Sequence, residues 1–237
     1  MKQHLSVLML AIRSSFYKLL AILAAMAVAE GVLFHLALRE NDILEYVFDG
    51  AFTHAVFLAG FLTLCAVLLL PGSERGGGRE RYTLRRLGVP ERTVVLWTWL
   101  GNSCCILIFW AAQLAFVLLL CKYYTMTAAP GAVNRQTIFL AFYRNNFLHA
   151  LLPLAELTRW MRNIALVVCL GGSTAAAPCR MRRGEQPVGT LVLTVASAAL
   201  FARPVGSVWT DILLTGYAVC STAYAVWMCW KEATDDD

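Results

Sequence analysis

Long apolar runs separated by short charged segments divide this chain along its whole length. A helix needs about 20 apolar residues to cross the hydrocarbon core of a bilayer, which is about 30 Å thick. On this criterion the pattern predicts six membrane-spanning helices, at about residues 16–38, 50–70, 94–121, 163–177, 188–203 and 207–230. The predicted fold class is therefore all-α, a polytopic membrane protein whose residues 1–237 form a single transmembrane domain.

The first 19 residues have an amphipathic pattern. At about 100° per residue the apolar side chains gather on one helical face and the polar ones along its flank. The apolar set is Leu5, Leu8, Ile12, Phe16 and Leu19, and the polar set is Lys2, Ser6 and Arg13. This segregation predicts that residues 1–15 form a helix lying in the membrane interface.

One apolar segment is too interrupted to be a comfortable span. Residues 137–157 contain Arg144, Asn145, Asn146, His149 and Pro153. If this segment crossed the membrane, the basic loop at 180–183 would lie outside, against the preference of Lys- and Arg-rich loops for the cytoplasm. We therefore predict short helices over residues 136–152, in or under the outer leaflet, with Pro153 placed to start the helix that leads into the fourth span.

Charge assigns a side to the other loops. The segment 75–92 holds six arginines, which favours the cytoplasm, whereas residues 39–49 hold four acids against one arginine, which suits an outside loop. The six spans then leave both termini in the cytoplasm.

Composition excludes a soluble protein. The chain is 59% hydrophobic and only 15% charged, and its mean hydropathy is +0.63. Six spans leave little chain for a catalytic domain. The net charge of +5 is low for a nucleic-acid-binding protein, and the arginines cluster at span ends, so we expect membrane lipid and no nucleic acid as a partner.

Polar residues within the spans are candidates for chemistry or packing. Glu30 lies well inside the first span, where a charge costs about 2.5–3.5 kcal/mol on insertion scales, so it must face protein or water or carry a proton. It is either a substrate or proton contact or a neutral acid that packs helices. Asn102 and Gln113 in the third span could line a substrate path or bond across helices. The spacing of Ala27 and Gly31 permits close helix approach.

The sequence gives only weak evidence for a metal site. The eight cysteines lie in or beside apolar runs without a CxxC pair, so we expect small buried thiols and no metal site. His35 and His54 lie near the outer ends of the first two spans and could hold a metal or haem, although histidines at that depth are more often solvated. Arg203 and Asp211 flank the last outer turn and are placed to pair.

The basic segment 76–93 has an internal pattern of its own. Three glycines lead into Arg79–Leu87, which can form about two helical turns, and Gly88 is placed to end that helix and Pro90 to begin the next. Such a helix would lie on a surface. The alternative is that these arginines only anchor the loop to anionic lipid.

Taken together, these features resemble the ABC-2 type permease family, the membrane subunits of bacterial ATP-binding-cassette transporters that move substrates outward. The resemblance rests on the amphipathic helix at 1–15, the six-span layout and the segment RYTLRRLGVPERTVVLW at 81–97. It implies a helix that couples the permease to a cytosolic ATPase, here Tyr82, Thr83, Leu84, Arg85, Arg86, Leu87 and Gly88. The broken helices before the fourth span depart from the family, many of whose members place such helices before the last span.

The resemblance implies an exporter permease in the bacterial cytoplasmic membrane that pairs with itself or with a homologous chain. It implies no enzyme activity and no cofactor here, because ATP is bound by the partner ATPase, and no nucleotide-binding GxxxxGK[ST] motif occurs in this chain. Two other functions stay open. One is an intramembrane enzyme or haem- or metal-handling protein that uses Glu30, His35, His54 or His149, and the other is a non-transporting sensor or assembly subunit.

Overall fold

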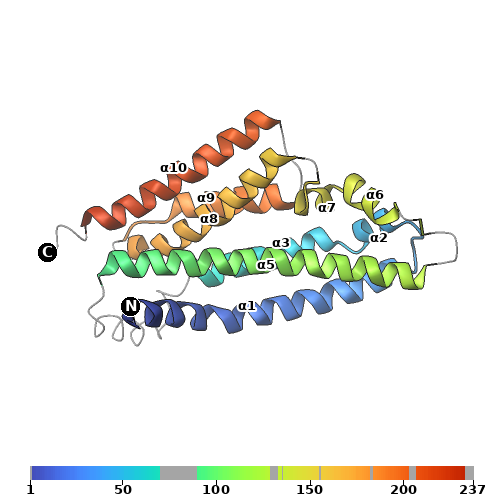
Figure 1. Cartoon of the computed structure of the whole chain (residues 1–237), viewed down its shortest axis with the longest axis horizontal. Coiled ribbons are helices and arrows are strands. Elements are labelled where there is room, and N and C mark those ends of the chain that lie inside the picture. The colour runs from blue at the N-terminus through green and yellow to red at the C-terminus, as the bar shows by residue number, and fades with distance from the viewer. Residues whose placement is uncertain are drawn as a thin grey trace.

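The computed structural model describes residues 2–69, 90–128, 133–134, 136–154, 156–181, 184–202 and 207–232, and side chains within them except at 2–14, 91 and 232. Every regular element in these ranges is an α-helix, which confirms the predicted class (Figure 1). The helices are α1 (Lys2–Ala37), α2 (Leu44–Gly50), α3 (Thr53–Leu69), α5 (Glu91–Thr127), α6 (Thr137–Arg144), α7 (Asn146–Leu151), α8 (Leu157–Met181), α9 (Val188–Ala202) and α10 (Val208–Glu232).

The long helices run along the longest axis of the molecule, and the short helices α2, α6 and α7 gather at one end of it (Figure 1). The start of α1 and the end of α10 both lie at the opposite end. There Arg92, at the start of α5, donates a hydrogen bond to the carbonyl oxygen of Trp230 over 3.3 Å. The two chain ends thus share one end of the bundle, and its cytoplasmic side stays a prediction.

The described helices provide four to five membrane spans, so the predicted number of six is confirmed only in part. Ser15–Ala37, Arg92–Thr127, Leu157–Met181 and Val208–Lys231 are each long and apolar enough to cross a membrane. The helices α2 and α3 together make a fifth only if this pair, bent by 47°, is one span. The predicted fifth span is α9, whose 15 residues reach only about 22 Å.

The predicted interfacial helix at 1–15 is not a separate element. Residues 2–37 form one continuous helix, because no glycine or proline interrupts residues 2–30. An amphipathic pattern specifies which face is apolar but does not end a helix. At 1.5 Å per residue α1 is about 54 Å long, more than the hydrocarbon core requires.

The segment 136–152 forms two short helices, as predicted, and Asn145 organises the joint between them. The Asn145 side chain accepts hydrogen bonds from the backbone N–H groups of Phe147 and Leu148 and so caps α7. Its amide nitrogen donates to Asp49 Oδ1 of α2 over 2.9 Å. This buried residue therefore fixes α6, α7 and α2 together. The following helix begins at Leu157 and not at Pro153.

Small residues place α8 at the centre of the bundle. Of its apolar window 67% is buried, against 28% or 33% for the other three candidate spans. The segment from Gly171 to Ala177 consists of Gly, Ser, Thr and Ala, all of them buried. A Cβ atom on Gly171 would lie 2.8 Å from the backbone nitrogen of Ser103 on α5, and one on Gly172 would lie 2.7 Å from the Trp99 ring. Only glycine allows the two helices to approach this closely.

Close approach occurs at other positions than the one predicted in the first span. A Cβ atom on Gly31 would meet nothing within 4 Å. On α3, in contrast, a Cβ atom on Gly60 would overlap the Met26 side chain of α1. The Met26 side chain thus occupies the space that a larger residue at position 60 would need.

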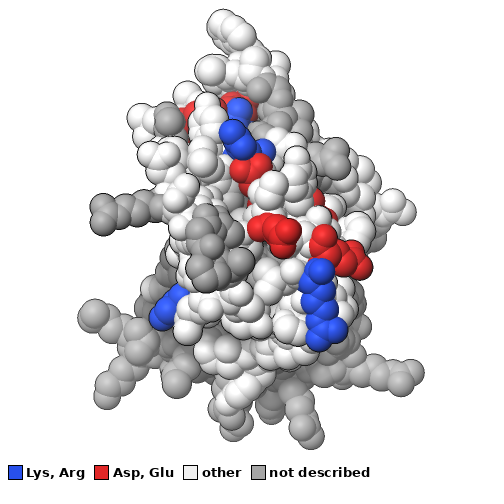
Figure 2. All heavy atoms as spheres, turned by 90° about the vertical axis from the view of Figure 1, so that its right-hand side faces the viewer, with Lys and Arg blue, Asp and Glu red and all other residues white. Residues whose placement is uncertain are grey.

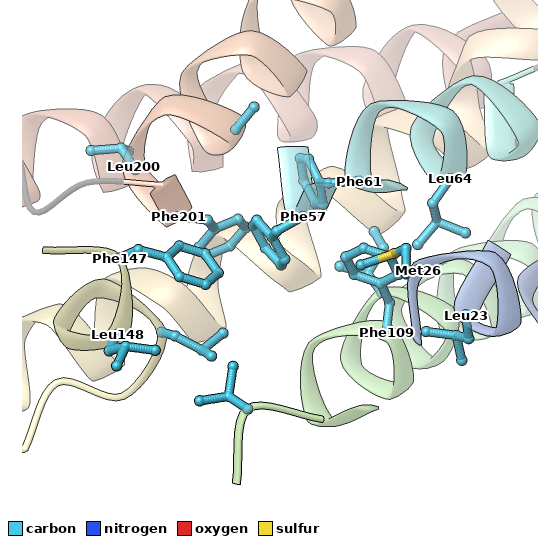
Figure 3. Packing of buried hydrophobic residues seen from close by; sticks show 14 of the residues in the cluster. Leu23, Met26, Phe57, Phe61, Leu64, Phe109, Phe147, Leu148, Leu200 and Phe201 are labelled. Atoms are coloured by element: carbon cyan, nitrogen blue, oxygen red, sulfur yellow. The ribbon is translucent and has the colours of Figure 1, made fainter. Parts of the chain in front are cut away.

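Aromatic side chains fill the space between α3, α5, α7 and α9 (Figure 3). The ring of Phe57 lies 5.4 Å from that of Phe147 and 5.6 Å from that of Phe109, measured between centroids. Phe61 meets Phe201 edge to face at 5.5 Å. These contacts join α7 to the long helices, so the short helices share the main core.

The outward faces of the long helices remain apolar. Exposed side chains include Val28 and Val32 on α1, Leu118 and Leu119 on α5, and Leu213 on α10. Such surface would be a liability in water, but it suits contact with lipid tails or with another membrane chain.

We expect Gly171→Ala to destabilise the protein and Gly216→Ala to be neutral or stabilising. The added methyl group at residue 171 meets backbone, and overpacking costs about 1–3 kcal/mol. At residue 216 the methyl group enters open space in α10, and alanine is the better helix former by about 1 kcal/mol. Thermal unfolding of both purified variants in detergent, followed by circular dichroism, measures the difference. Equal stabilities would contradict the close packing of α8 on α5.

Candidate functional site

Buried polar pairs connect neighbouring helices at three levels of the bundle. One joins α1 to α5, the second α5 to α8 and the third α8 to α10. A polar group in a membrane interior needs an internal partner, because hydrocarbon offers no hydrogen bonds. These pairs are therefore the places where function or helix packing can depend on chemistry.

The first pair contains two of the residues predicted from the sequence. Gln113 Nε2 of α5 donates to Glu30 Oε1 of α1 over 2.6 Å, and both residues are at most 1% exposed. Glu30 lies here because it occupies a buried stripe of α1 whose other members recur at helical spacing, namely Leu19, Leu23, Met26, Phe34 and Ala37. Glu30 Oε2 and Gln113 Oε1 are also buried, and neither has a hydrogen-bond partner in the described part of the chain.

The third predicted residue, Asn102, belongs to a different pair. Its Nδ2 donates to Thr174 Oγ1 of α8 over 3.1 Å. Nearby, Trp99 Nε1 donates to the carbonyl oxygen of Val168 over 2.8 Å. Asn102 and Gln113 are 11 residues apart on α5, about 16 Å along the axis, so the structure does not combine them into one site.

The third pair is a buried ion pair that sequence reasoning missed. Arg162 Nη1 of α8 lies 2.6 Å from Asp211 Oδ1 of α10, and both side chains are almost fully buried. Arg162 also donates from Nε and Nη2 to Asn163 Oδ1. The predicted partner of Asp211, Arg203, lies outside the described residues, and the cation found beside Asp211 is Arg162. The sequence does contain a signal for this pair: an arginine near the start of an apolar helix needs an acidic partner on a neighbouring helix.

Acidic and basic side chains also meet at the end of the molecule that carries α2, α6 and α7 (Figure 2). Arg144 lies 3.6 Å from Glu45, and His149 Nε2 lies 3.7 Å from Glu156 Oε1. Glu156 also pairs with Arg159. These partly exposed pairs connect α6 to α2, and α7 to the start of α8.

The residues proposed for metal or haem handling are not assembled into a site. His35 Nδ1 lies 3.1 Å from the Tyr123 hydroxyl, and the ring of His54 lies beside that of Phe52. No interaction between Glu30, His35 and His54 is found, and the described residues contain no group of three His, Cys, Asp or Glu side chains able to hold a metal ion. All eight cysteines are free thiols, and Cys104 and Cys220 are exposed although burial was predicted.

The predicted coupling helix, Tyr82 to Gly88, lies outside the described residues. Shortly after it in the chain, Pro90 takes the N-cap position and α5 begins at Glu91, in agreement with the helix start predicted at Pro90. Comparison with protein-family models, with curated proteins and with solved structures finds no match to this chain.

We expect Arg162→Met to destabilise the protein strongly, because it leaves the Asp211 carboxylate buried without a cation. Removing one partner of a buried ion pair typically costs about 3–5 kcal/mol. The double variant Arg162→Met with Asp211→Leu should recover most of the loss, since an apolar replacement of both partners is often neutral.

The matched control is Arg144→Met, which removes an arginine that is 64% exposed from its pair with Glu45. A surface pair contributes about 0–1 kcal/mol. Denaturant unfolding in detergent gives all three values. If Arg162→Met is no more destabilising than Arg144→Met, the buried pair does not stabilise α8 against α10.

Proposed function

We propose that this chain is the membrane-spanning permease subunit of an ATP-binding-cassette exporter, coupled to a cytosolic ATPase that is a separate chain. The observation that supports the proposal is the place of α5. This helix directly follows the basic segment in which the family resemblance lies, and it packs against both α1 and α8.

Polar contacts hold α5 along its whole length. Arg92 bonds the end of α10, Asn102 bonds α8, Gln113 bonds α1, and the Tyr124 hydroxyl donates to the carbonyl oxygen of Asp42. The last three recur about every 11 residues, close to three helical turns. A helix of 37 residues is about 55 Å long, so α5 links the two ends of the bundle.

This arrangement gives a path for coupling. A displacement of the segment before α5 would move α5 as a rigid body, because its contacts prevent sliding at several levels. Through Asn102 and Thr174 the motion would reach α8, and through Arg162 and Asp211 it would reach α10. Rocking of the bundle by ATPase closure is the kind of rigid-body change that alternating access needs.

In this proposal the chain contributes no catalytic group. ATP binds to the partner ATPase, and a second permease, identical or homologous, completes the transporter. The exposed apolar faces of α1, α5 and α10 are available to lipid and to this second chain.

We expect Leu84→Asp and Leu87→Asp to uncouple the ATPase. Placing a charge in an apolar contact costs at least about 2 kcal/mol, which corresponds to about 30-fold weaker binding. Gly88→Val should also be harmful if Gly88 ends the helix in a left-handed conformation. Co-purification with the ATPase and ATP turnover in lipid measure the effect.

The matched control for these variants is Arg86→Gln, which removes one charge from the same segment, and a surface ion pair contributes less than about 1 kcal/mol. All variants should still reach the membrane. Unchanged ATPase binding and turnover in both leucine variants would refute the coupling helix and leave lipid anchoring as the role of this loop.

We expect residues 39–49 to lie outside the cell and the turn at Glu185 to lie inside. Glu40 and Glu185 are exposed, so Glu40→Cys and Glu185→Cys in a cysteine-free background are accessible to a membrane-impermeant thiol reagent. In intact cells only Glu40→Cys should react, and Glu185→Cys should react after permeabilisation. The reverse pattern would invert the topology and remove the arginine loop from the cytoplasm.

A further inference from the structure

The contact between Glu30 and Gln113 contains one hydrogen bond and two buried oxygen atoms that lack a hydrogen-bond donor. Gln113 Nε2 donates to Glu30 Oε1, while Glu30 Oε2 and Gln113 Oε1 are both buried and without a partner among the described residues. An ionised carboxylate and an amide oxygen can only accept. With Glu30 charged, two acceptors are therefore left facing an apolar interface, an arrangement that folded proteins rarely tolerate.

The other buried carboxylate in the bundle shows how a charge is accommodated here. Asp211 has the Arg162 guanidinium 2.6 Å away, so the pair is neutral as a unit. Glu30 has no such cation: its one interaction partner in the described structure is the amide of Gln113. The neighbouring helices α2, α3 and α5 bring other ionisable groups, and none of those described forms an ion pair with Glu30. These groups are Glu45, Tyr46 and Asp49 on α2, His54 and Cys65 on α3, and Arg92, Cys104, Cys105, Cys121, Lys122, Tyr123 and Tyr124 on α5.

We propose that Glu30 is a proton-binding site in the membrane interior, and that the bound proton completes an acid–amide pair with Gln113. The carboxylate takes up one proton on Oε2, and this O–H group donates to Gln113 Oε1 while Gln113 Nε2 donates to Oε1. One proton thus satisfies both orphan acceptors and removes the net charge. Release of that proton returns a carboxylate with a single hydrogen bond between α1 and α5.

This site makes the packing of α1 on α5 dependent on a proton. Apart from the exposed contact of His35 with Tyr123, the acid–amide pair is the polar side-chain contact found between the described parts of the two helices, and apolar side chains surround it. Loss of the proton favours any arrangement in which water reaches Glu30, because a charge in an apolar medium is strongly disfavoured. The inference does not depend on the transport function proposed above.

Infrared spectroscopy of the full-length protein in lipid bilayers at neutral pH tests the proposal. A protonated carboxyl group has a carbonyl stretching band distinct from that of carboxylates, and the band moves to lower frequency in D₂O. We expect the wild-type protein to show this band, and we expect it to disappear in Glu30→Gln. The controls are Glu40→Gln, at an exposed acid, and Glu45→Gln, at a partly buried acid paired with Arg144, and both should keep the band.

A second variant keeps the test decisive if Glu30→Gln does not fold. In Gln113→Leu the band should persist but move to higher frequency, because the acid carbonyl loses its N–H donor. A wild-type protein without the band, a band that survives in Glu30→Gln, or an unchanged band position in Gln113→Leu would each overturn the proposal.

Discussion

The close packing of α8 against α5 and α10 is the constraint on which the rest of the bundle depends. Lipid tails are as apolar as leucine, so helices in a membrane associate through packing and internal hydrogen bonds and not through exclusion of water. At Gly171 and Gly172 the helix surfaces approach until no methyl group fits. Only at this separation can Trp99 reach the carbonyl oxygen of Val168, and Thr222 that of Cys169. These hydrogen bonds therefore depend on the close approach that the two glycines allow.

Buried charge is neutralised in two different ways in this protein. In the ion pair of Arg162 and Asp211 a cation on one helix balances an anion on the next, and this fixes α8 relative to α10. Between α1 and α5 no cation among the described side chains pairs with Glu30, and a proton on Glu30 takes its place in our proposal. An ion pair is closed to exchange with solvent so long as both helices stay in contact. A proton site can be emptied, which makes the contact of α1 with α5 the one that solution conditions could change.

The sequence predicts where the helices lie better than it predicts which helices contact one another. Apolar run length locates the long helices, and the broken pattern around Arg144 and Pro153 correctly indicates short ones. Run length is a poorer guide to spans, because α9 has a suitable composition but only 15 residues. Partners depend on how each helix is rotated and which helix lies beside it, information that periodicity along one segment does not contain. For this reason Glu30 and Gln113 are identified singly but not as a pair, and Arg162 is not recognised as a partner of Asp211.

The polar contacts of α5 also bear on how a signal could cross this protein. A helix held only by apolar contacts can slide or rotate at small cost, since one leucine contact replaces another. Asn102 and Gln113 leave α5 in nearly the same direction but bond different helices, so a rotation of α5 about its own axis breaks both hydrogen bonds. Motion that keeps both bonds must carry α1, α5 and α8 together. A force applied before Glu91 is then transmitted as movement of this three-helix group and of α10, which the pair of Arg162 and Asp211 holds against α8, and the remaining freedom lies at the borders with α3 and α9.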